Sequence, residues 1–224
     1  MTPPPRVETP LAHRRNAVWK TLQWICQNLF AVWLGFRARG IENLPPGPAL
    51  LIGNHQSFLD PMLIGLPLQR PVCFLARDTL FKVPVIGWIL RSTYVMPIRR
   101  ESAGTESLRV SLKRLEDGYL VGIFPEGTRS RDGKLGVMKP GFVALLRRAQ
   151  VPVIPVAVSG AFEAMPRGAI FPKPRRVRIE FGAPISVEEL AAFQGRGSEV
   201  ELVNLVTERL TQVLNDADEW RRRG

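Results

Sequence analysis

The sequence predicts an α/β fold in which a mostly parallel or mixed central sheet is flanked by helices, with an amphipathic helix near the N-terminus. Two observations predict this fold. Short apolar runs bounded by proline or glycine alternate with longer stretches of helical periodicity, as in chains that build parallel sheets. The 224 residues are 45% apolar, which is enough for one sizeable domain with a packed core.

Six apolar runs have the length and the boundaries of buried strands. They are residues 49–52, 71–76, 92–98, 119–125, 151–160 and 177–182. Amphipathic periodicity or helix-boundary residues predict helices at residues 61–68, 103–116, 141–149, 187–193 and 199–216. We expect Asp60 to be the N-cap of the first of these helices, with Pro61 at its first position.

The chain divides into three parts by composition. Residues 1–10 are polar and rich in proline, which predicts a flexible tail. Residues 11–39 form a helical segment, in which the helix covers residues 11–36. Residues 40–224 then form the α/β domain.

The N-terminal helical segment has the composition of a membrane-interface helix. Its apolar run, residues 22–36, is roughly 15 residues long, whereas a spanning helix needs roughly 20. Aromatic anchors next to basic side chains favour a helix that lies in the membrane interface. A packed soluble helix and a spanning helix are the alternatives. The aromatic residues are Trp19, Trp24 and Trp33, and the basic ones are Arg14, Arg15 and Lys20.

The formal net charge of +11 predicts an anionic partner or substrate. Basic residues that flank an apolar, tryptophan-bearing segment fit a membrane surface better than a nucleic acid. The basic clusters carry few interleaved aromatic residues, so no nucleic-acid partner is expected. Cys26 and Cys73 lie among apolar neighbours and are expected to be buried thiols. With no cysteine cluster and two histidines, the sequence predicts no metal site.

The first candidate site is the heptapeptide Asn54-His55-Gln56-Ser57-Phe58-Leu59-Asp60, which follows a predicted strand. Two residues five apart point about 140° away from each other on a regular helix. A turn between strand and helix removes this obstacle and can bring the Asp60 carboxylate to the His55 imidazole. A carboxylate that accepts from one ring nitrogen leaves the other nitrogen as a base. The alternative is a structural histidine next to a capping aspartate.

The second candidate site is Phe124-Pro125-Glu126-Gly127-Thr128-Arg129-Ser130, which follows another predicted strand. Gly127 permits close approach of a ligand to the backbone. The guanidinium group of Arg129 suits a phosphate group. Lys139 is a further cationic candidate on chemical grounds. An exposed turn with a solvated arginine is the alternative interpretation.

Taken together, the NHxSxxD pattern, the later FPEGTRS motif and the strand Val153-Ile154-Pro155-Val156 resemble the glycerolipid acyltransferase family, especially bacterial 1-acylglycerol-3-phosphate acyltransferases. The resemblance covers residues 40–185. It implies a catalytic dyad of His55 and Asp60. It also implies that Glu126, Gly127, Thr128 and Arg129 bind a glycerol-phosphate acceptor.

A further motif of that family, Gly-x-x-Phe-Ile-x-Arg, corresponds loosely to residues 93–99. Arg99 keeps the position of a phosphate ligand. Thr93 and Met96 replace the glycine and the aromatic residue, and this departure bears on the identity of the acceptor more than on the chemistry.

The expected reaction is direct acyl transfer, with His55 as general base and no cofactor. The donor co-substrate is acyl-CoA or acyl-carrier protein, and the latter is then a candidate partner. Ser57 and Cys73 are not expected to be nucleophiles, because the chain has no G-x-S-x-G elbow. We expect the protein to bind lysophospholipid at the cytoplasmic face of the inner membrane, as a peripheral or monotopic protein. Apolar segments at 80–90 line an acyl tunnel, form a second membrane contact or belong to the ordinary core.

Two other functions stay open on the sequence alone. One is acylation of a different lysolipid, such as a lyso-ornithine lipid. The other is a non-catalytic membrane lipid-binding protein. The paired His55 and Asp60 argue against the second, since binding a lipid requires no positioned base.

Overall fold

The computed structural model describes residues 16–98, 103–193, 195 and 197–224. Within them, seven strands form one mixed sheet in the order β1-β7-β6-β2-β5-β3-β4. Neighbouring strands run parallel except β6 and β7, which pair antiparallel. The predicted α/β fold with a mostly parallel or mixed sheet is therefore confirmed. The strands are β1 (Arg37–Arg39), β2 (Ala49–Gly53), β3 (Val72–Arg77), β4 (Met96–Ile98), β5 (Leu120–Ile123), β6 (Val153–Ser159) and β7 (Arg178–Phe181).

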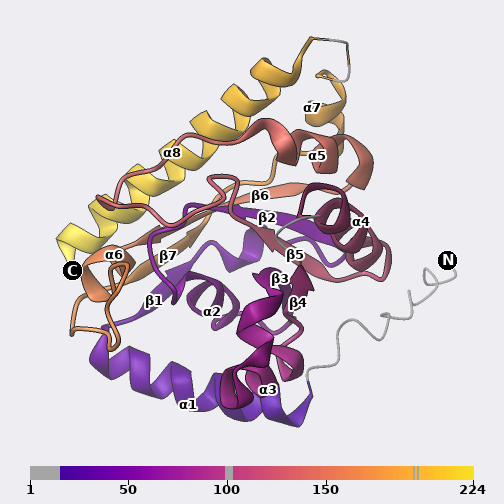
Figure 1. Ribbon diagram of the computed structural model, residues 1–224. Helices are drawn as coiled ribbons and strands as arrows, with labels where there is room; N and C mark the ends of the chain where they lie inside the picture. The colour runs from indigo at the N-terminus through magenta and orange to yellow at the C-terminus, as the bar shows by residue number, and fades with distance from the viewer. Residues whose placement is uncertain (1–15, 99–102, 194, 196) are drawn as a thin grey trace, which may run out of the picture.

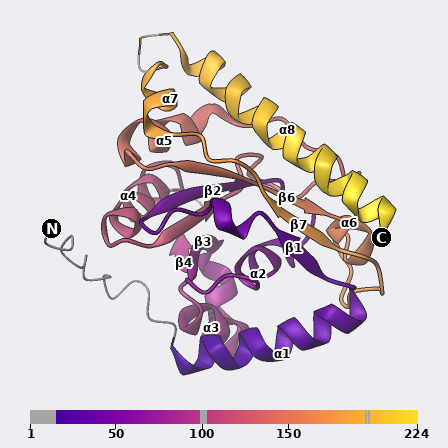
Figure 2. The same ribbon diagram turned by 180° about the vertical axis from the view of Figure 1, so that it is seen from behind.

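Helices cover both faces of this sheet (Figures 1 and 2). One face carries α1 (Ala17–Trp33), α2 (Asp60–Gly65) and α3 (Pro84–Ser92), and the other carries α4 (Ala103–Glu116), α5 (Val143–Ala149), α7 (Val187–Ala191) and α8 (Glu199–Arg223). The short helix α6 (Ala161–Ala164) follows β6, and three 3₁₀ turns lie at η2 (Ile41–Asn43), η3 (Asp78–Lys82) and η4 (Pro140–Phe142).

Strand β2 shows why the sheet has two cores. All five of its residues are buried, as expected for a central strand covered on both faces. Ala49 and Leu51 pack into the cluster shared with α1 and α2. Leu50 and Ile52 pack into the cluster shared with α4, α5 and α8. A continuous apolar run is what such a strand requires.

Several elements differ from the sequence expectation. The expected strand 92–98 is reduced to β4, because residues up to Ser92 belong to α3, which the sequence reading did not identify. Helix α8 continues to Arg223 rather than ending near residue 216. The edge strand β1 lies in the range assigned to the N-terminal segment, so the sheet begins at Arg37 and not after residue 40.

The N-terminal helix α1 spans Ala17–Trp33, within the 11–36 expected. The tail 1–10 and the first residues of the expected helix lie outside the described residues. Among the described helices, none combines the length and the apolar character needed to cross a bilayer.

Candidate active site

The parallel pairing of β2 with β5 places the two candidate motifs at one edge of the sheet. Ile52 pairs with Ile123 in this register. His55 follows two residues after the end of β2, and Glu126 follows three residues after the end of β5. Because parallel strands end at the same edge, the two loops emerge side by side, where ligands of α/β sheets bind.

His55 and Asp60 form a hydrogen-bonded pair, with Nδ1 of the imidazole 2.8 Å from Oδ2 of the carboxylate. The same oxygen accepts the backbone N–H groups of Gln56 (2.6 Å) and Ser57 (2.7 Å). The chain reversal before α2 makes this contact, as the sequence suggested. With Nδ1 donating to the carboxylate, Nε2 is the nitrogen that can accept a proton.

Asp60 is not the N-cap of α2, so that part of the sequence interpretation is wrong. The cap residue is Leu59, and Asp60 is the first helical residue. Its carboxylate turns back to the preceding loop because three donors converge there. Asp60 is fully buried, and burial raises the pKa of its carboxyl, while the hydrogen bonds from His55, Ser57 and Gln56 oppose that shift.

The imidazole is held on its face as well as at its edge. The ring of Phe124 stacks on His55 with 4.2 Å between ring centroids and 14° between planes. About a fifth of the His55 side chain stays exposed, at 19%. The ring is therefore fixed in orientation while still open to a substrate.

Glu126 joins the second motif to the first. Its Oε1 accepts the backbone N–H of His55 at 2.7 Å, and its Oε2 accepts the N–H of Gly136 at 2.9 Å. The residue is 4% exposed, and burial raises the pKa of its carboxyl, against the effect of these two hydrogen bonds. The carbonyl of His55 in turn accepts the N–H of Ser130 at 2.7 Å. The backbone of His55 is thus fixed from both sides by the FPEGTRS loop.

The remaining residues of the loop bring positive charge to the surface. Gly127 has φ +66°, and a Cβ there would lie 2.9 Å from Nζ of Lys139, so glycine lets this lysine approach. Thr128 is exposed and Arg129 is half-buried. Within the described part of the chain, neither Arg129 nor Lys139 forms an ion pair. Arg99 lies outside the described residues.

The two departures from the family pattern before Arg99 are both buried. Thr93 donates its hydroxyl hydrogen to the carbonyl of Ile89 at 2.8 Å, at the end of α3. Met96 is 3% exposed and belongs to the core between the sheet and α4 and α5. The two departures from the family pattern therefore concern packing in the core.

Three neighbours of His55 to which the sequence analysis gave no role hold the candidate catalytic turn, residues 54–60, in place. The side chain of Asn54 bonds both the carbonyl and the N–H of Val158, at 2.9 and 2.7 Å. Gln56 Nε2 donates to the carbonyl of Gly133 at 2.7 Å. Ser57 Oγ donates to the carbonyl of Met165 at 2.8 Å, so this buried hydroxyl is part of the turn's framework. These polar residues can be noticed in the sequence because they adjoin His55. Their hydrogen-bond partners are distant along the chain, so the sequence alone does not reveal them.

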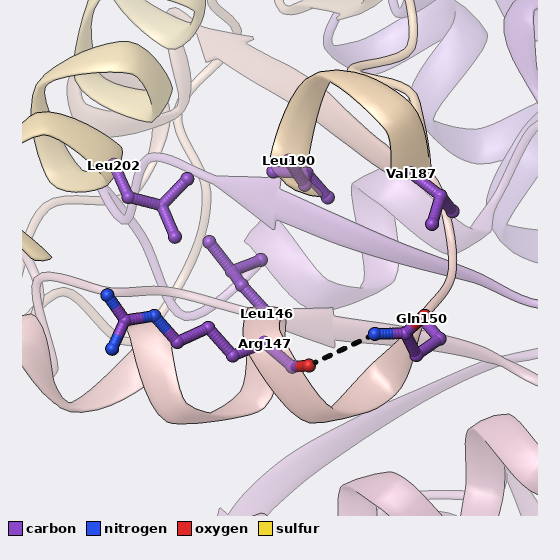
Figure 3. A pocket seen from close by; sticks show the side chains of 6 residues that line it. All are labelled: Leu146, Arg147, Gln150, Val187, Leu190 and Leu202. Carbon is purple, nitrogen blue, oxygen red and sulfur yellow. Dashed lines mark hydrogen bonds between the residues drawn. The ribbon is translucent and has the colours of Figure 1, made fainter. Parts of the chain in front are cut away.

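Two hollows of the described structure lie away from this edge. The one in Figure 3 lies between α5, α7 and α8 and has a cavity of about 10 Å³. That volume is at the lower limit for one water molecule. Its lining residues are Leu146, Arg147, Gln150, Val187, Leu190 and Leu202. A hollow of about 430 Å³ beside η4 and α5 also contains no residue of either motif. No group of three or more metal-ligating side chains occurs in the described ranges.

Comparison with known proteins gives consistent matches. A family model described as Acyltransferase matches residues 35–159, which include both motifs. A chloroplastic 1-acyl-sn-glycerol-3-phosphate acyltransferase of Brassica napus is 34% identical over 176 residues, covering 75% of this chain and 51% of the relative. The chain therefore spans about half the length of that plant relative.

Bacterial relatives match over more of their own length. The 1-acyl-sn-glycerol-3-phosphate acyltransferase of Bacillus subtilis (strain 168) is 26% identical over 202 residues, covering 87% of this chain and 98% of the relative. The crystal structure of the 1-acyl-sn-glycerophosphate (LPA) acyltransferase PlsC from Thermotoga maritima superposes with a TM-score of 0.71 at 27% identity. That superposition covers 88% of this chain and 78% of the other.

Proposed function

The chain belongs to the Acyltransferase family, and we propose that it moves a fatty acyl group from an acyl thioester to the free hydroxyl of 1-acylglycerol-3-phosphate, giving phosphatidic acid. The observation that carries the proposal is the His55–Asp60 pair, whose free Nε2 lies at the sheet edge where the cationic loop emerges. The names of the relatives in plants and bacteria support the choice of acceptor.

The proposed chemistry is a direct transfer. His55 Nε2 takes the proton of the acceptor hydroxyl while the hydroxyl oxygen attacks the thioester carbonyl carbon. Asp60 holds the imidazole and stabilises its cation. The tetrahedral intermediate then collapses, the carbon–sulfur bond breaks, and the imidazolium returns its proton to the departing thiolate. General-base assistance of this kind contributes about 10²–10⁴-fold.

Positive charge beside the dyad would hold the acceptor phosphate. Arg129 offers a planar fork for phosphate oxygens, and Lys139 adds a point charge next to Gly127. We propose Arg99 as a third phosphate ligand. Gly127 and Thr128 would bring the backbone of the exposed loop close to the glycerol unit. A clamped phosphate fixes where the hydroxyl lies, which lowers the entropy cost of the reaction.

The donor is acyl-CoA or acyl-carrier protein, and either supplies the same thioester. Thr93 and Met96 are buried, so these departures from the family pattern place no new side chain on the surface that would meet the acceptor, and a phosphate-bearing acceptor stays the first candidate. A lysolipid with another head group, such as a lyso-ornithine lipid, remains the second candidate acceptor.

Helix α1 supports a peripheral position on a membrane, which for this reaction is the cytoplasmic face of the inner membrane. Large apolar side chains project from it to solvent, with Trp24 at 68% and Val32 at 87% exposure. Such a face suits the interfacial region of a bilayer. We propose that the segment 11–39, which ends with strand β1, forms this membrane contact.

The test is thioester consumption by the purified protein on lipid vesicles, with lysophosphatidic acid and a panel of other lysolipids as acceptors. Phosphatidic acid formation that disappears in His55→Ala, and persists in the surface control Arg109→Gln, is the expected result. Turnover with another lysolipid alone would replace the acceptor and keep the mechanism. Absence of transfer from both donor types to every acceptor would overturn the proposal.

A further inference from the structure

The loop between α6 and β7, residues 165–176, presents apolar side chains to solvent at its tip. Ile170 and Phe171 are adjacent and each is 81% exposed. The loop is closed by backbone hydrogen bonds from Ala169 N to the carbonyl of Pro166 (3.0 Å) and from Lys173 N to the carbonyl of Ala164 (2.7 Å). A closed loop that holds two large apolar residues exposed at its tip offers that surface to a partner.

Basic side chains flank this tip on both sides. All four are exposed, and none forms an ion pair with a described carboxylate. They are Arg167, Lys173, Arg175 and Arg176. An apolar tip with exposed basic residues on both sides in the sequence complements an interface of acyl chains below anionic head groups.

The loop is continuous with the exposed apolar face of α1. Trp33 Nε1 donates to the carbonyl of Pro172 at 2.9 Å. The N–H of Val177 donates to the carbonyl of Leu34 at 3.0 Å. Figures 1 and 2 both place the segment after α6 beside the C-terminal end of α1. The tip and the helix therefore lie on neighbouring parts of one surface.

The other end of the loop is fastened to the catalytic turn. The carbonyl of Met165 accepts the hydroxyl hydrogen of Ser57 at 2.8 Å. Ser57 is two residues from His55 and donates its N–H to Asp60. One loop thus connects the apolar surface of α1 to the turn that holds the proposed base.

We propose that residues 165–176 are a second membrane-binding element, which inserts Ile170 and Phe171 into an anionic bilayer and holds the catalytic turn at its surface. This inference rests on the proposed function, since it names the partner surface of the same site. A stable protein interface buries about 800 Å² on each partner. Two side chains at a loop tip are too small for that, whereas membrane insertion needs few residues.

The experiment measures partition of the full chain onto sedimented vesicles of phosphatidylcholine, with and without phosphatidylglycerol. Ile170→Ser with Phe171→Ser is expected to lower the partition coefficient at least about tenfold. Val200→Ser is the control, because Val200 is 67% exposed in the first turn of α8, and the N-terminal end of α8 lies on the opposite side of the sheet from α1. That control should bind as the unaltered chain does.

The charges are tested separately. Lys173→Gln with Arg175→Gln should weaken binding about fivefold per charge on anionic vesicles, and leave binding to neutral vesicles unchanged. Arg109→Gln with Arg148→Gln removes the same charge from α4 and α5 and should have a smaller effect. Equal loss from both pairs would overturn the cationic part of the proposal.

An environment-sensitive probe separates insertion from indirect effects. The probe is attached to a cysteine at position 170, or at position 200 as control, in a chain lacking Cys26 and Cys73. A blue shift with anionic vesicles at position 170 alone is expected. The absence of a shift at position 170 would overturn the proposal. So would a tip variant, Ile170→Ser with Phe171→Ser, that binds vesicles normally but no longer binds acyl-carrier protein.

These measurements need no turnover, so the two proposals can fail independently. Suppose that the unaltered chain transfers no acyl group, and that the tip variant loses vesicle binding. That result would support the membrane loop and contradict the proposed reaction. Acyl transfer and vesicle partition that are both unchanged in the tip variant would support the proposed reaction and contradict the membrane loop.

Discussion

The candidate catalytic turn at residues 54–60 and the loop at residues 124–136 each contain one buried carboxylate, but the two carboxylates are bonded differently. Asp60 uses one oxygen for the His55 ring and for two backbone N–H groups. Glu126 uses both oxygens for backbone N–H groups, one of them that of His55 itself. One carboxylate therefore acts on the imidazole, and the other acts on the backbone that carries it.

This difference teaches that residue type and burial alone do not assign a role. The pKa of both carboxyl groups is raised by burial, and both are opposed by hydrogen bonds. The two roles differ in which groups donate to each carboxylate. Asp60 accepts from the imidazole of the proposed base, whereas Glu126 accepts from backbone N–H groups alone. The predictions below separate the two roles, in order of decreasing effect.

Replacing His55, the proposed base, should have the largest effect. His55→Ala removes the group that we propose takes the proton, so kcat is expected to fall about 10²–10⁴-fold. The fold should persist, because the side chain is partly exposed and Asp60 keeps its two backbone donors. Steady-state rates on vesicles, with circular dichroism as the control for folding, check this. A variant that retains more than a tenth of the activity would remove His55 from the mechanism.

Removing the charge of Asp60 should have the next largest effect. In Asp60→Asn the amide oxygen can take the place of Oδ2 and accept the same three donors. The NH₂ group takes the place of Oδ1, which is buried and has no hydrogen-bond partner among the described residues. Hydrogen bonds to charged groups contribute about 1.5–3 kcal/mol, so kcat should fall about ten- to a hundredfold with a small change in KM. A change in KM alone would contradict the role of orienting and stabilising the imidazole.

The sequence allowed the general plan of the fold to be predicted because its central strands are covered on both faces. Strands β2 and β6 are continuous apolar runs, and their predicted positions agree with the structure to within a few residues. The edge strand β1 was missed because Arg37-Ala38-Arg39 has no apolar run to mark it. Helix α3 was missed because its exposed Val85 and Trp88 obscure the usual apolar–polar pattern.

The candidate site was predictable as far as its residues lie within one motif. The pairing of His55 with Asp60 requires only a turn of six residues, which the spacing indicates. The link from Glu126 to His55 spans two distant segments, and it depends on β2 and β5 being neighbours in the sheet. Strand order carries no local sequence signal, so the positioning role of Glu126 emerges from the structure and not from its motif.

Glu126→Gln tests that role directly. The amide NH₂ must face a backbone N–H, either of His55 or of Gly136, and a buried donor left without an acceptor costs about 1–3 kcal/mol. We expect the free energy of unfolding to fall by this amount, and kcat to fall about three- to tenfold because His55 shifts. KM for lysophosphatidic acid should change little. Denaturant unfolding and a separate determination of kcat and KM check the prediction.

Two results would change the interpretation of Glu126. A raised KM with unchanged stability would show that the carboxylate contacts the acceptor, as the family resemblance implies. Arg129→Gln is the useful comparison, because Arg129 is proposed to bind the acceptor phosphate. That variant should raise KM about five- to tenfold, as expected for one lost hydrogen bond worth about 1–1.5 kcal/mol, while its stability stays close to that of the unaltered chain.

The smallest effect concerns pH, and it uses the same pair of proteins. Burial raises the pKa of Glu126 above the ordinary value of about 4.3, so the folded state binds the proton more tightly than the unfolded state. The stability that this shift contributes is complete below about pH 4.3 and is lost as pH rises through the raised pKa.

Glu126→Gln cannot titrate at this position. The difference in free energy of unfolding between the unaltered chain and this variant should therefore shrink across that pH window and then level off. Asp60 titrates in both proteins, and its charge adds to the raised pKa of Glu126 in the unaltered chain, so this coupling is part of the measured difference. Denaturant unfolding of both proteins from pH 4 upward measures the difference, and an advantage that grows with pH would mean that the two backbone donors outweigh burial at Glu126.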